Sequence, residues 1–412
     1  MGKMLYMDYA ATTPPAAEVV HKTLPWLREK FGNPSAVCAN GQEARQAVET
    51  ARKAAAKLIR ADEEEIYFTS GGTEADNWVL EKCCPYGQTT HIITSSIEHH
   101  AVLHTCRAMA QRGVKVTFVD PDEKGRISPR DIERHIGKDT RLISIMFANN
   151  EVGTIQPVAE IGALAKEYGI PFHTDAVQVV GHLPIEVDSW NITYLSASAH
   201  KFYGLKGCGF LYCNKGYELP ALIHGGAQEK GMRAGTENMP GIVALGEAAR
   251  ICETRLSWEA AAVKPLRNLM ISQLEKIPGS HLMGDPQKRL PGNVHFCFDG
   301  IDGRSLALLL QQEGICVSAG AACSSKAEVS HVLSAMHIPD DYIRGALRIS
   351  LGTELNRQDI LYASRRIAEN VLRLRHMEQS QEMQPGFGHE ESKTGEDQGK
   401  VRRNVPAGKK YS

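Results

Sequence analysis

Lys201 stands in an unusual sequence neighbourhood. In the segment SASAHKFYG (196–204), small residues precede the lysine and two aromatic residues follow it. An exposed lysine beside a buried strand would explain this pattern without any chemistry, and this is the common case for an isolated lysine. Small neighbours would also leave room for a bulky group that the lysine amine must touch. The other polar segments of the chain decide between these two interpretations.

A second segment is suited to bind an anion. TSGGTEADN (69–77) leads from a strand-like run through a Gly-Gly turn into a helix-like run. Backbone amides at such a helix start, together with the Thr73 hydroxyl, would surround a phosphate. A turn with a helix cap explains the same letters equally well. The motif GxxxxGK[ST] does not occur and no GxGxxG follows a strand, which disfavours a nucleoside triphosphate and a dinucleotide.

Other strand-like runs also end in polar residues. His99 opens a helix in SSIEHHAVL, Asn150 follows a strand in ANNEVGTIQP, and Asp175 ends a strand in HTDAVQ. His100 and His104 lie four residues apart and could share a metal ion, but no third ligand has a suitable spacing, so we predict no metal site. A histidine that faces a pocket from a helix start is the better interpretation.

Pyridoxal 5'-phosphate is a ligand that uses all of these groups at once. Lys201 would hold the cofactor as a Schiff base, and Asp175 would keep its pyridine nitrogen protonated so that the ring can accept electrons. An amide would bind the phenolic oxygen, an imidazole would stack on the ring, and the Gly-Gly turn would hold the phosphate. The sequence therefore predicts a pyridoxal-phosphate site, and the small residues before Lys201 leave space for it.

The elements that must position these residues alternate along the chain. From residue 64 onward, strand-like runs alternate with helix-like runs of about 10 to 15 residues, which predicts an α/β fold with a largely parallel sheet covered on both faces. Ligands of such sheets bind beyond the carboxyl ends of the strands, where the polar residues lie. The predicted strands span residues 65–70, 91–95, 114–120, 141–147, 171–175 and 192–198.

We divide the chain into four parts. Residues 1–15 form an N-terminal segment that packs with the small domain, and residues 16–258 form a large cofactor-binding domain. Residues 259–377 form a small α+β C-terminal domain that carries the loop with Cys323. Residues 378–412 are polar, rich in Gly and Pro and without a period, which predicts a disordered tail.

Composition restricts the class of protein. The 412 residues carry a formal net charge of -1 and are 42% hydrophobic, which is typical of globular domains with a large core. A charge near zero gives no basis for nucleic-acid or membrane partners. No apolar run approaches the roughly 20 residues of a membrane span, and the first residues lack the apolar core of a signal peptide. We therefore expect a cytoplasmic protein. The ten cysteines are too sparse for a disulfide scaffold and include no CxxC pair, so we expect no zinc ribbon either.

Ten blocks follow one another between about residue 5 and about residue 375: MDYAATTP, FGNPSA, TSGGTEADN, IEHHAV, NNEVGTIQP, HTDAVQ, SAHKFYGLKG, GMRAGTEN, SAGAACSS and LRISLG. In these blocks and their order the sequence resembles the cysteine desulfurases of the NifS/IscS type, a class V aminotransferase branch of the fold-type I pyridoxal-phosphate enzymes. The resemblance implies a large domain with a mainly parallel sheet, a smaller α+β C-terminal domain, a homodimer and L-cysteine as substrate.

The resemblance also implies roles for single residues. Lys201 would be the Schiff-base lysine, His99 would stack on the ring and assist proton transfer, and Cys323 would be the nucleophile. Asn33 and Arg348 would bind the substrate carboxylate. The implied cofactor-binding residues are Gly72, Thr73, His99, Asn150, Asp175, Gln178, Ser198, His200, Lys201 and, for the phosphate of the neighbouring subunit, Thr236.

Cys323 stands in SAGAACSSKAEVSHVL, where a buried small residue in a turn is the ordinary interpretation. By resemblance, its thiolate attacks the sulfur of L-cysteine and L-alanine leaves. The persulfide then passes to a sulfur-acceptor protein for iron–sulfur cluster, thio-cofactor or tRNA synthesis. The segment after Cys323 is one residue shorter than in many members of this family and lacks their proline. How far this loop can carry the thiol, and to which acceptor, therefore stays open. Cys38 replaces the usual histidine after NPS and has no assigned role.

Other functions stay open at this point. A selenocysteine lyase or another class V aminotransferase-like enzyme would share the site but would release selenide or form a keto acid. A non-catalytic pyridoxal-binding scaffold in a sulfur-transfer complex would bind the cofactor without turnover. The presence of Lys201, Asp175 and Cys323 argues against such a scaffold.

Overall fold

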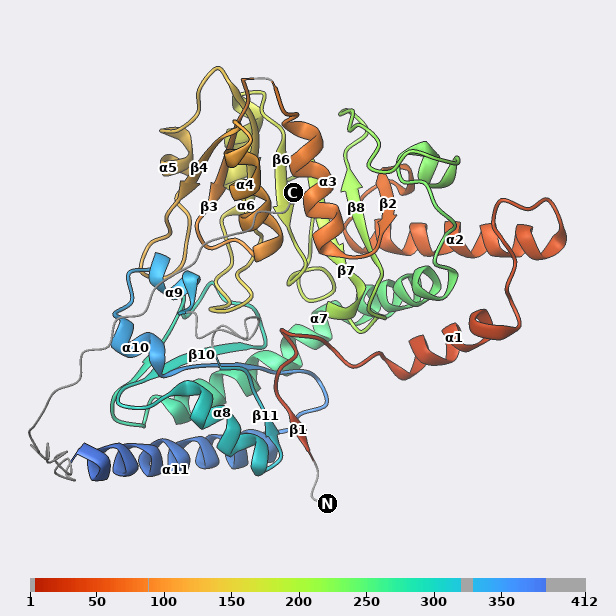
Figure 1. Cartoon of the computed structure of the whole chain (residues 1–412). Coiled ribbons are helices and arrows are strands. Elements are labelled where there is room, and N and C mark those ends of the chain that lie inside the picture. Colours follow the sequence, from red (N-terminus) through yellow and green to blue (C-terminus); the bar gives the residue numbers. More distant parts are fainter. Residues whose placement is uncertain (1–3, 88, 320–328, 383–412) are drawn as a thin grey trace, which may run out of the picture.

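The computed structural model describes residues 4–87, 89–319 and 329–382 of the 412-residue chain (Figure 1). Its centre is a seven-stranded sheet, here called the large sheet, with the strand order β2-β8-β7-β6-β5-β3-β4. Among these strands, β8 runs antiparallel to both of its neighbours and the other pairs are parallel, as the alternating sequence pattern predicts. The strands are β2 (Ile66–Thr69), β3 (His91–Ser95), β4 (Lys115–Val119), β5 (Thr140–Ser144), β6 (Phe172–Asp175), β7 (Tyr194–Ser198) and β8 (Gly209–Cys213).

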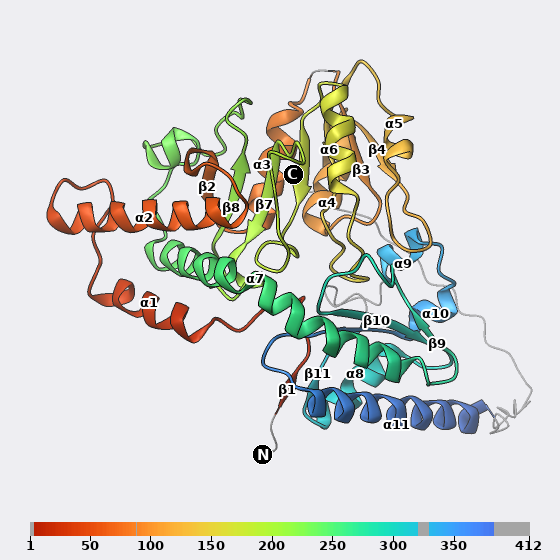
Figure 2. The ribbon, with the colours of Figure 1, turned by 180° about the vertical axis from the view of Figure 1, so that it is seen from behind.

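Two layers of helices cover the large sheet, α3 and α4 on one face and α2, α6 and α7 on the other (Figures 1 and 2). Successive side chains of a strand point to opposite faces, so Tyr194 packs in the core with α3 while Leu195 packs in the core with α2 and α7. Burial on both faces explains why β8 lacks an alternation of apolar and polar residues and is buried at every position. The helices are α1 (Ala17–Arg28), α2 (Ala39–Leu58), α3 (Gly72–Cys83), α4 (His100–Gln111), α5 (Pro129–Glu133), α6 (Val158–Glu167) and α7 (Met239–Leu274), with short 3-10 turns η1 (Glu63–Glu65), η2 (Ala199–Lys201) and η3 (Gln228–Gly231).

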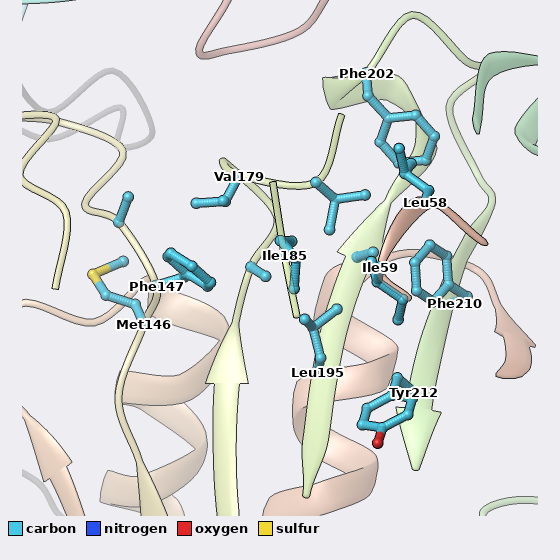
Figure 3. Packing of buried hydrophobic residues seen from close by; sticks show 14 of the residues in the cluster. Leu58, Ile59, Met146, Phe147, Val179, Ile185, Leu195, Phe202, Phe210 and Tyr212 are labelled. Carbon is cyan, nitrogen blue, oxygen red and sulfur yellow. The ribbon is translucent and has the colours of Figure 1, made fainter. Parts of the chain in front are cut away.

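Figure 3 shows part of the core on the α2 side of the large sheet. Leu195 of β7 and Phe210 of β8 pack in one cluster with Leu58 and Ile59 from the end of α2. Phe202, the residue after Lys201, is fully buried in the same cluster. Each such side chain contributes about 1.5 to 3 kcal/mol through burial, so this core fixes the chain on the C-terminal side of Lys201.

A second group of elements surrounds an antiparallel sheet of three strands, here called the small sheet, in the order β12-β10-β9. A parallel pair, β1 with β11, joins the N-terminal segment to this group. Phe296, Phe298 and Ile349 are fully buried in its core. The elements are β1 (Leu5–Tyr6), β9 (Ser280–Leu282), β10 (Asn293–Phe298), α8 (Gly303–Gln312), β11 (Ile315–Cys316), α9 (His331–Ala335), α10 (Asp340–Arg344), β12 (Ala346–Ser350) and α11 (Arg357–Glu382).

Helix α7 connects the two cores (Figure 2). Its first part, with Ala248, belongs to the core of the large sheet, and its last part, with Met270, belongs to the core of the small sheet. The predicted boundary between residues 258 and 259 therefore falls inside a continuous helix, and the domain limits remain predictions. Helix α11 reaches Glu382, inside the predicted tail, whose other residues lie outside the described ones. Within the described ranges, no helix has the length and apolarity needed to cross a bilayer.

Candidate active site

Strands β2, β3, β5, β6 and β7 run parallel, so their carboxyl ends meet at one edge of the large sheet. The turn after β2 opens α3, whose N-cap residue Gly71 provides no side-chain cap. A Cβ on Gly72 would lie 2.5 Å from Cγ2 of Val177 and 4.0 Å from Cβ of Ser198. The helix start is therefore packed directly against the ends of β6 and β7, and its first amides stay available to an anion.

Asp175 and His99 form the acid and imidazole part of this edge. The buried Asp175 carboxylate accepts a hydrogen bond from the Val177 amide at 2.9 Å. Burial, followed by the charge of Asp76, raises the pKa of Asp175 to about 6, while nearby His99 opposes this shift. Nδ1 of His99 accepts from the Ala101 amide at 3.1 Å, which leaves its other ring nitrogen to carry the proton.

His99 is an exposed residue at the start of α4, as a stacking partner for a planar cofactor requires. Desolvation by the surrounding protein lowers the pKa of His99; Lys201 and His100 lower it further and Asp175 opposes them. The imidazole is therefore neutral near pH 7. A neutral ring beside an acid of raised pKa can take up or deliver a proton at small cost.

The amine of Lys201 is held by the N-terminal segment. Its Nζ donates to the carbonyl oxygens of Ala10 at 2.7 Å and Ala11 at 2.9 Å. Nε2 of Gln178 donates to the same Ala10 oxygen at 3.0 Å. Two predicted cofactor-binding side chains thus converge on one carbonyl, although they come from separate segments after β6 and β7.

Ser198 and His200 directly precede Lys201 at the end of β7 and in η2. The buried Ser198 ends β7, and Nδ1 of His200 lies 3.1 Å from Oγ1 of Thr12. Burial, followed by the charge of Lys201, lowers the pKa of His200 to about 4. His200 is therefore neutral near pH 7 and acts at this site through hydrogen bonds.

Arg348 reaches the site from the small sheet. Its guanidinium donates to Oδ1 of Asp8 at 2.9 Å and to the backbone oxygen of Asn150 at 3.2 Å. Its Nε is buried, and among the described residues no hydrogen-bond partner contacts this atom. A buried guanidinium with donor capacity left over is suited to an anionic group such as a carboxylate.

Besides His99, three predicted site residues are exposed in the single chain. Thr73 lies in the first turn of α3, Thr236 lies in the loop before α7, and the Asn33 side chain accepts from the Ser35 amide within its own loop at 2.9 Å. Their roles remain predictions. Cys323 lies outside the described residues, so its role also remains a prediction.

The described residues on both sides of residues 320–328 lie beside this edge. Ser318 exchanges two backbone hydrogen bonds with Arg348, of 2.7 and 3.0 Å. Nε2 of His331 lies 3.0 Å from the backbone oxygen of Glu98, next to His99. The two attachment points of the segment that contains Cys323 are thus close to a predicted substrate ligand and to a predicted catalytic residue.

Comparisons with known proteins add to this geometry. The chain matches the family "Aminotransferase class-V" over residues 5–362. It belongs to the class-V aminotransferases.

It is 50% identical over 378 residues to "Cysteine desulfurase IscS" of Methanosarcina thermophila, with 91% of this chain and 94% of that protein covered. The solved structure "NIFS-LIKE PROTEIN" matches with a TM-score of 0.84 and 37% identity, over 90% of this chain and 99% of that one. The solved structure "SspA in complex with cysteine" matches with a TM-score of 0.75 and 35% identity, over 85% of this chain and 99% of that one. These findings confirm the predicted family and fold class.

Class-V aminotransferases use pyridoxal 5'-phosphate, and the residues present fit that cofactor. The fit rests on the uncapped start of α3, the buried carboxylate of Asp175, the exposed His99 and the amine of Lys201. Each of these groups lies at or just after the end of a different strand of the large sheet. The cofactor predicted from the sequence is therefore confirmed for this class-V aminotransferase.

The sequence analysis did not identify three buried polar residues that lie near the site. Burial raises the pKa of Asp76 to about 7 and that of Glu98 to about 8. His173 lies between Oγ of Ser144 at 2.8 Å and Oγ of Ser196 at 3.0 Å. One sequence signal could have identified His173. Because it lies two residues before Asp175 on the same strand, both side chains lie on one face of the sheet.

The histidines considered for a metal ion also come together. The ring of His100 lies 4.7 Å from that of His104 and 4.9 Å from that of His331, measured between ring centroids. Among the described residues, however, no group of three or more His, Cys, Asp or Glu side chains has a geometry that could hold a metal.

Proposed function

We propose that this class-V aminotransferase is a cysteine desulfurase that converts L-cysteine to L-alanine and carries the abstracted sulfur as a persulfide on Cys323. The main geometric support is Arg348, which brings a guanidinium from the small sheet to the same sheet edge as Lys201 and Asp175. An enzyme acting on an amino acid needs such a carboxylate ligand beside its lysine. The names of relatives that are 45 to 50% identical narrow the amino acid to cysteine.

Bound pyridoxal 5'-phosphate supplies the electron sink for chemistry at the α-carbon of the substrate. Arg348 binds the substrate carboxylate and so orients the α-carbon toward Lys201. The amine of Lys201, once free, takes the α-proton, and the Ala10 and Ala11 carbonyls guide this amine through its hydrogen bonds. The buried carboxylate of Asp175 provides the negative charge that a protonated ring nitrogen requires.

The sulfur step belongs to the thiolate of Cys323. It attacks the substrate sulfur, so a new S–S bond forms while the bond between the β-carbon and sulfur of the substrate breaks. The electron pair of the broken bond stays with the carbon skeleton, which takes up a proton and leaves as L-alanine. The cysteine sulfur is retained as a persulfide on the enzyme, and no external oxidant or reductant is consumed.

Exposed apolar residues support a homodimer with shared sites. Val20, Leu24, Leu27 and Phe31 follow one another on α1 and just beyond it at intervals of three or four residues, and Leu27 is 65% and Phe31 77% exposed. Such a stripe is suited to pack against a protein surface. The exposed Thr236 would then contact the cofactor phosphate of the other subunit. A sulfur-acceptor protein and a cytoplasmic location remain predictions from the sequence.

The function is tested by incubating the cofactor-loaded enzyme with L-cysteine and measuring alanine and peptide masses. We expect the Cys323→Ser variant to bind the cofactor but to form alanine roughly 1,000-fold more slowly or worse, because a hydroxyl is a poor nucleophile toward sulfur. The exposed Cys38 provides the matched control, since Cys38→Ser should keep the parent rate.

The mass of one extra sulfur should appear on the peptide that contains Cys323. A persulfide found mainly on Cys38 would refute the assignment of the nucleophile. A keto acid in place of alanine, turnover of selenocysteine alone, or cofactor binding with no turnover would refute the desulfurase function itself.

A further inference from the structure

His182 contacts the backbone of Lys201 and is not part of the site described so far. It lies in the turn after β6, four residues beyond Gln178. Its Nδ1 lies 2.9 Å from Oε1 of Glu259 on α7, and its Nε2 lies 2.8 Å from the backbone oxygen of Lys201. The side chain of His182 is 22% exposed and that of Glu259 10%, so the pair is largely shielded from solvent.

Both partners of the His182 ring are hydrogen-bond acceptors. A backbone carbonyl can only accept, and an ionised carboxylate can only accept. Each ring nitrogen must therefore carry a hydrogen for both bonds to form, which makes His182 an imidazolium ion paired with Glu259. The hydrogen bond and charge of Glu259 outweigh burial and raise the pKa of His182, in agreement with this assignment.

The chain on the C-terminal side of Lys201 is tied to the same carboxylate. The hydroxyl of Tyr203 donates to Oε1 of Glu259 at 2.8 Å, and its amide donates to Oγ1 of Thr13 at 2.8 Å. Tyr203 has a φ of 68°, a left-handed conformation that costs a non-glycine residue about 1 to 2 kcal/mol. Contacts with α7 and the N-terminal segment thus hold an unfavourable backbone turn directly after the lysine.

We propose that the His182–Glu259 ion pair is a positioning device for Lys201, which fixes the carbonyl of the lysine and thereby the direction in which its amine points. This inference rests on the proposed role of Lys201 in cofactor binding but not on the identity of the substrate. Glu259 lies on the helix that connects the two cores, so the device also links the lysine to the small sheet.

The surroundings let the pair respond to pH. A cavity of about 50 Å³ is lined by His182 and Glu259 together with apolar residues such as Val263 and Leu351. Its volume is large enough for water, and the two charged side chains provide polar partners for it. Among the described residues, the titratable groups beside the pair include Tyr203, which donates to Glu259, and Tyr9, which lines the same cavity. Cys252 on α7 is a third, and its pKa is raised by burial and then by the charge of Glu259. Loss of the imidazolium proton at high pH leaves only one N–H, so one of the two hydrogen bonds must break.

The first experiment measures the protonation of His182 in the cofactor-loaded enzyme by ¹⁵N NMR of the histidine rings, with the signal assigned by its absence in His182→Gln. We expect both ring nitrogens to carry hydrogens at pH 7 and the proton to be lost at lower pH in Glu259→Gln. A singly protonated His182 ring at pH 7 would overturn the proposal.

The second experiment measures the pH midpoint of the visible absorbance of the bound cofactor, which reports on the lysine that holds it. We expect His182→Gln and Glu259→Gln to shift this midpoint by about 0.5 unit or more, because a displaced lysine and a lost charge alter the proton affinity beside it. The matched control is His281→Gln, which removes another histidine–carboxylate pair, with Asp299 at 2.9 Å, on the small sheet.

No shift in either test variant, or an equal shift in His281→Gln, would overturn the positioning role. The isosteric Glu259→Gln variant keeps the test valid if His182→Gln does not fold. Neither measurement uses L-cysteine or Cys323, so a failure of the proposed desulfurase function would leave both results interpretable.

Discussion

Single residues beneath the site set its protonation. Glu98 is fully buried, and one of its oxygens accepts from Oγ of Ser95 at 2.6 Å and from the Met146 amide at 2.9 Å. Its second oxygen, Oε2, has no hydrogen-bond partner among the described residues. Burial raises the pKa of Glu98 to about 8 from an ordinary value of 4.5. A neutral Glu98 near pH 7 removes one of the like charges that would oppose ionisation of Asp175.

This raised pKa predicts how stability depends on pH. Glu98 binds its proton more tightly in the folded chain than in the unfolded chain, so its contribution is fully present below pH 4.5 and is lost as the pH rises through about 8. Glu98→Gln cannot ionise. We therefore expect the unfolding free energy of the parent to fall relative to the variant by up to about 1.4 kcal/mol per pH unit within this window.

Urea unfolding at several pH values between 5 and 8.5 measures this difference. The exposed Glu167 provides the control, since Glu167→Gln should leave the pH dependence of the parent unchanged. A difference between the parent and Glu98→Gln that stays constant over the whole range would show that Glu98 is ionised in the folded protein.

At the scale of elements, the contact between α3 and the end of β6 determines the shape of the predicted phosphate cradle. Gly72 lets the first turn of α3 approach Val177, whose amide donates to the Asp175 carboxylate. The helix start and the predicted partner of the ring nitrogen are thus linked through one residue. A side chain at position 72 would disturb both ends of the cofactor site together.

Gly72→Ala tests this link. Its Cβ would lie 2.5 Å from Val177, a distance that forces the turn or the valine to move. We expect cofactor affinity to fall about 10-fold or more, in line with the loss of one or two hydrogen bonds to charged groups. Equilibrium titration of the protein with pyridoxal 5'-phosphate measures the dissociation constant.

The control is Gly137→Ala, because a Cβ on Gly137 meets no atom within 4 Å and its φ lies outside the left-handed region. This variant should bind the cofactor as the parent does. Equal affinities for Gly72→Ala and the parent would mean that the α3 start does not contribute to the cradle in the way proposed.

At the scale of the whole molecule, the exposed apolar residues of α1 test the proposed homodimer. Leu24 is 54% and Leu27 65% exposed, and both lie on the helix just before the loop that contains Asn33. We expect the double variant Leu24→Glu, Leu27→Glu to sediment as a monomer and to lose most of its activity, because charges on an apolar interface oppose association.

Leu308 on α8 is 61% exposed and provides the matched control. Leu308→Glu should keep the oligomeric state and activity of the parent in sedimentation velocity and alanine-formation assays. A parent enzyme that is fully active as a monomer would contradict the proposed dimer, whatever the variants do.

The sequence by itself determined the fold class, the family and the cofactor. Alternating strand-like and helix-like runs predict the parallel sheet because a parallel strand needs a long crossover, usually a helix, to reach the next strand. Strand limits were less accurate: the run 141–147 was predicted as one strand, but β5 ends at Ser144. The apolar residues beyond it are buried in a loop whose amides, those of Ile145 and Phe147, bond to the backbone of β6, so hydrophobicity alone could not mark the end.

The tertiary structure alone decided which polar groups share an environment. His182 and Glu259 are 77 residues apart, and their pairing follows from the path of α7 between the two cores. The raised pKa of Glu98 likewise follows from burial by elements distant in sequence, which no local pattern encodes. Periodicity and motifs report contacts within one element or one turn, whereas charge states depend on desolvation and on partners brought together by packing.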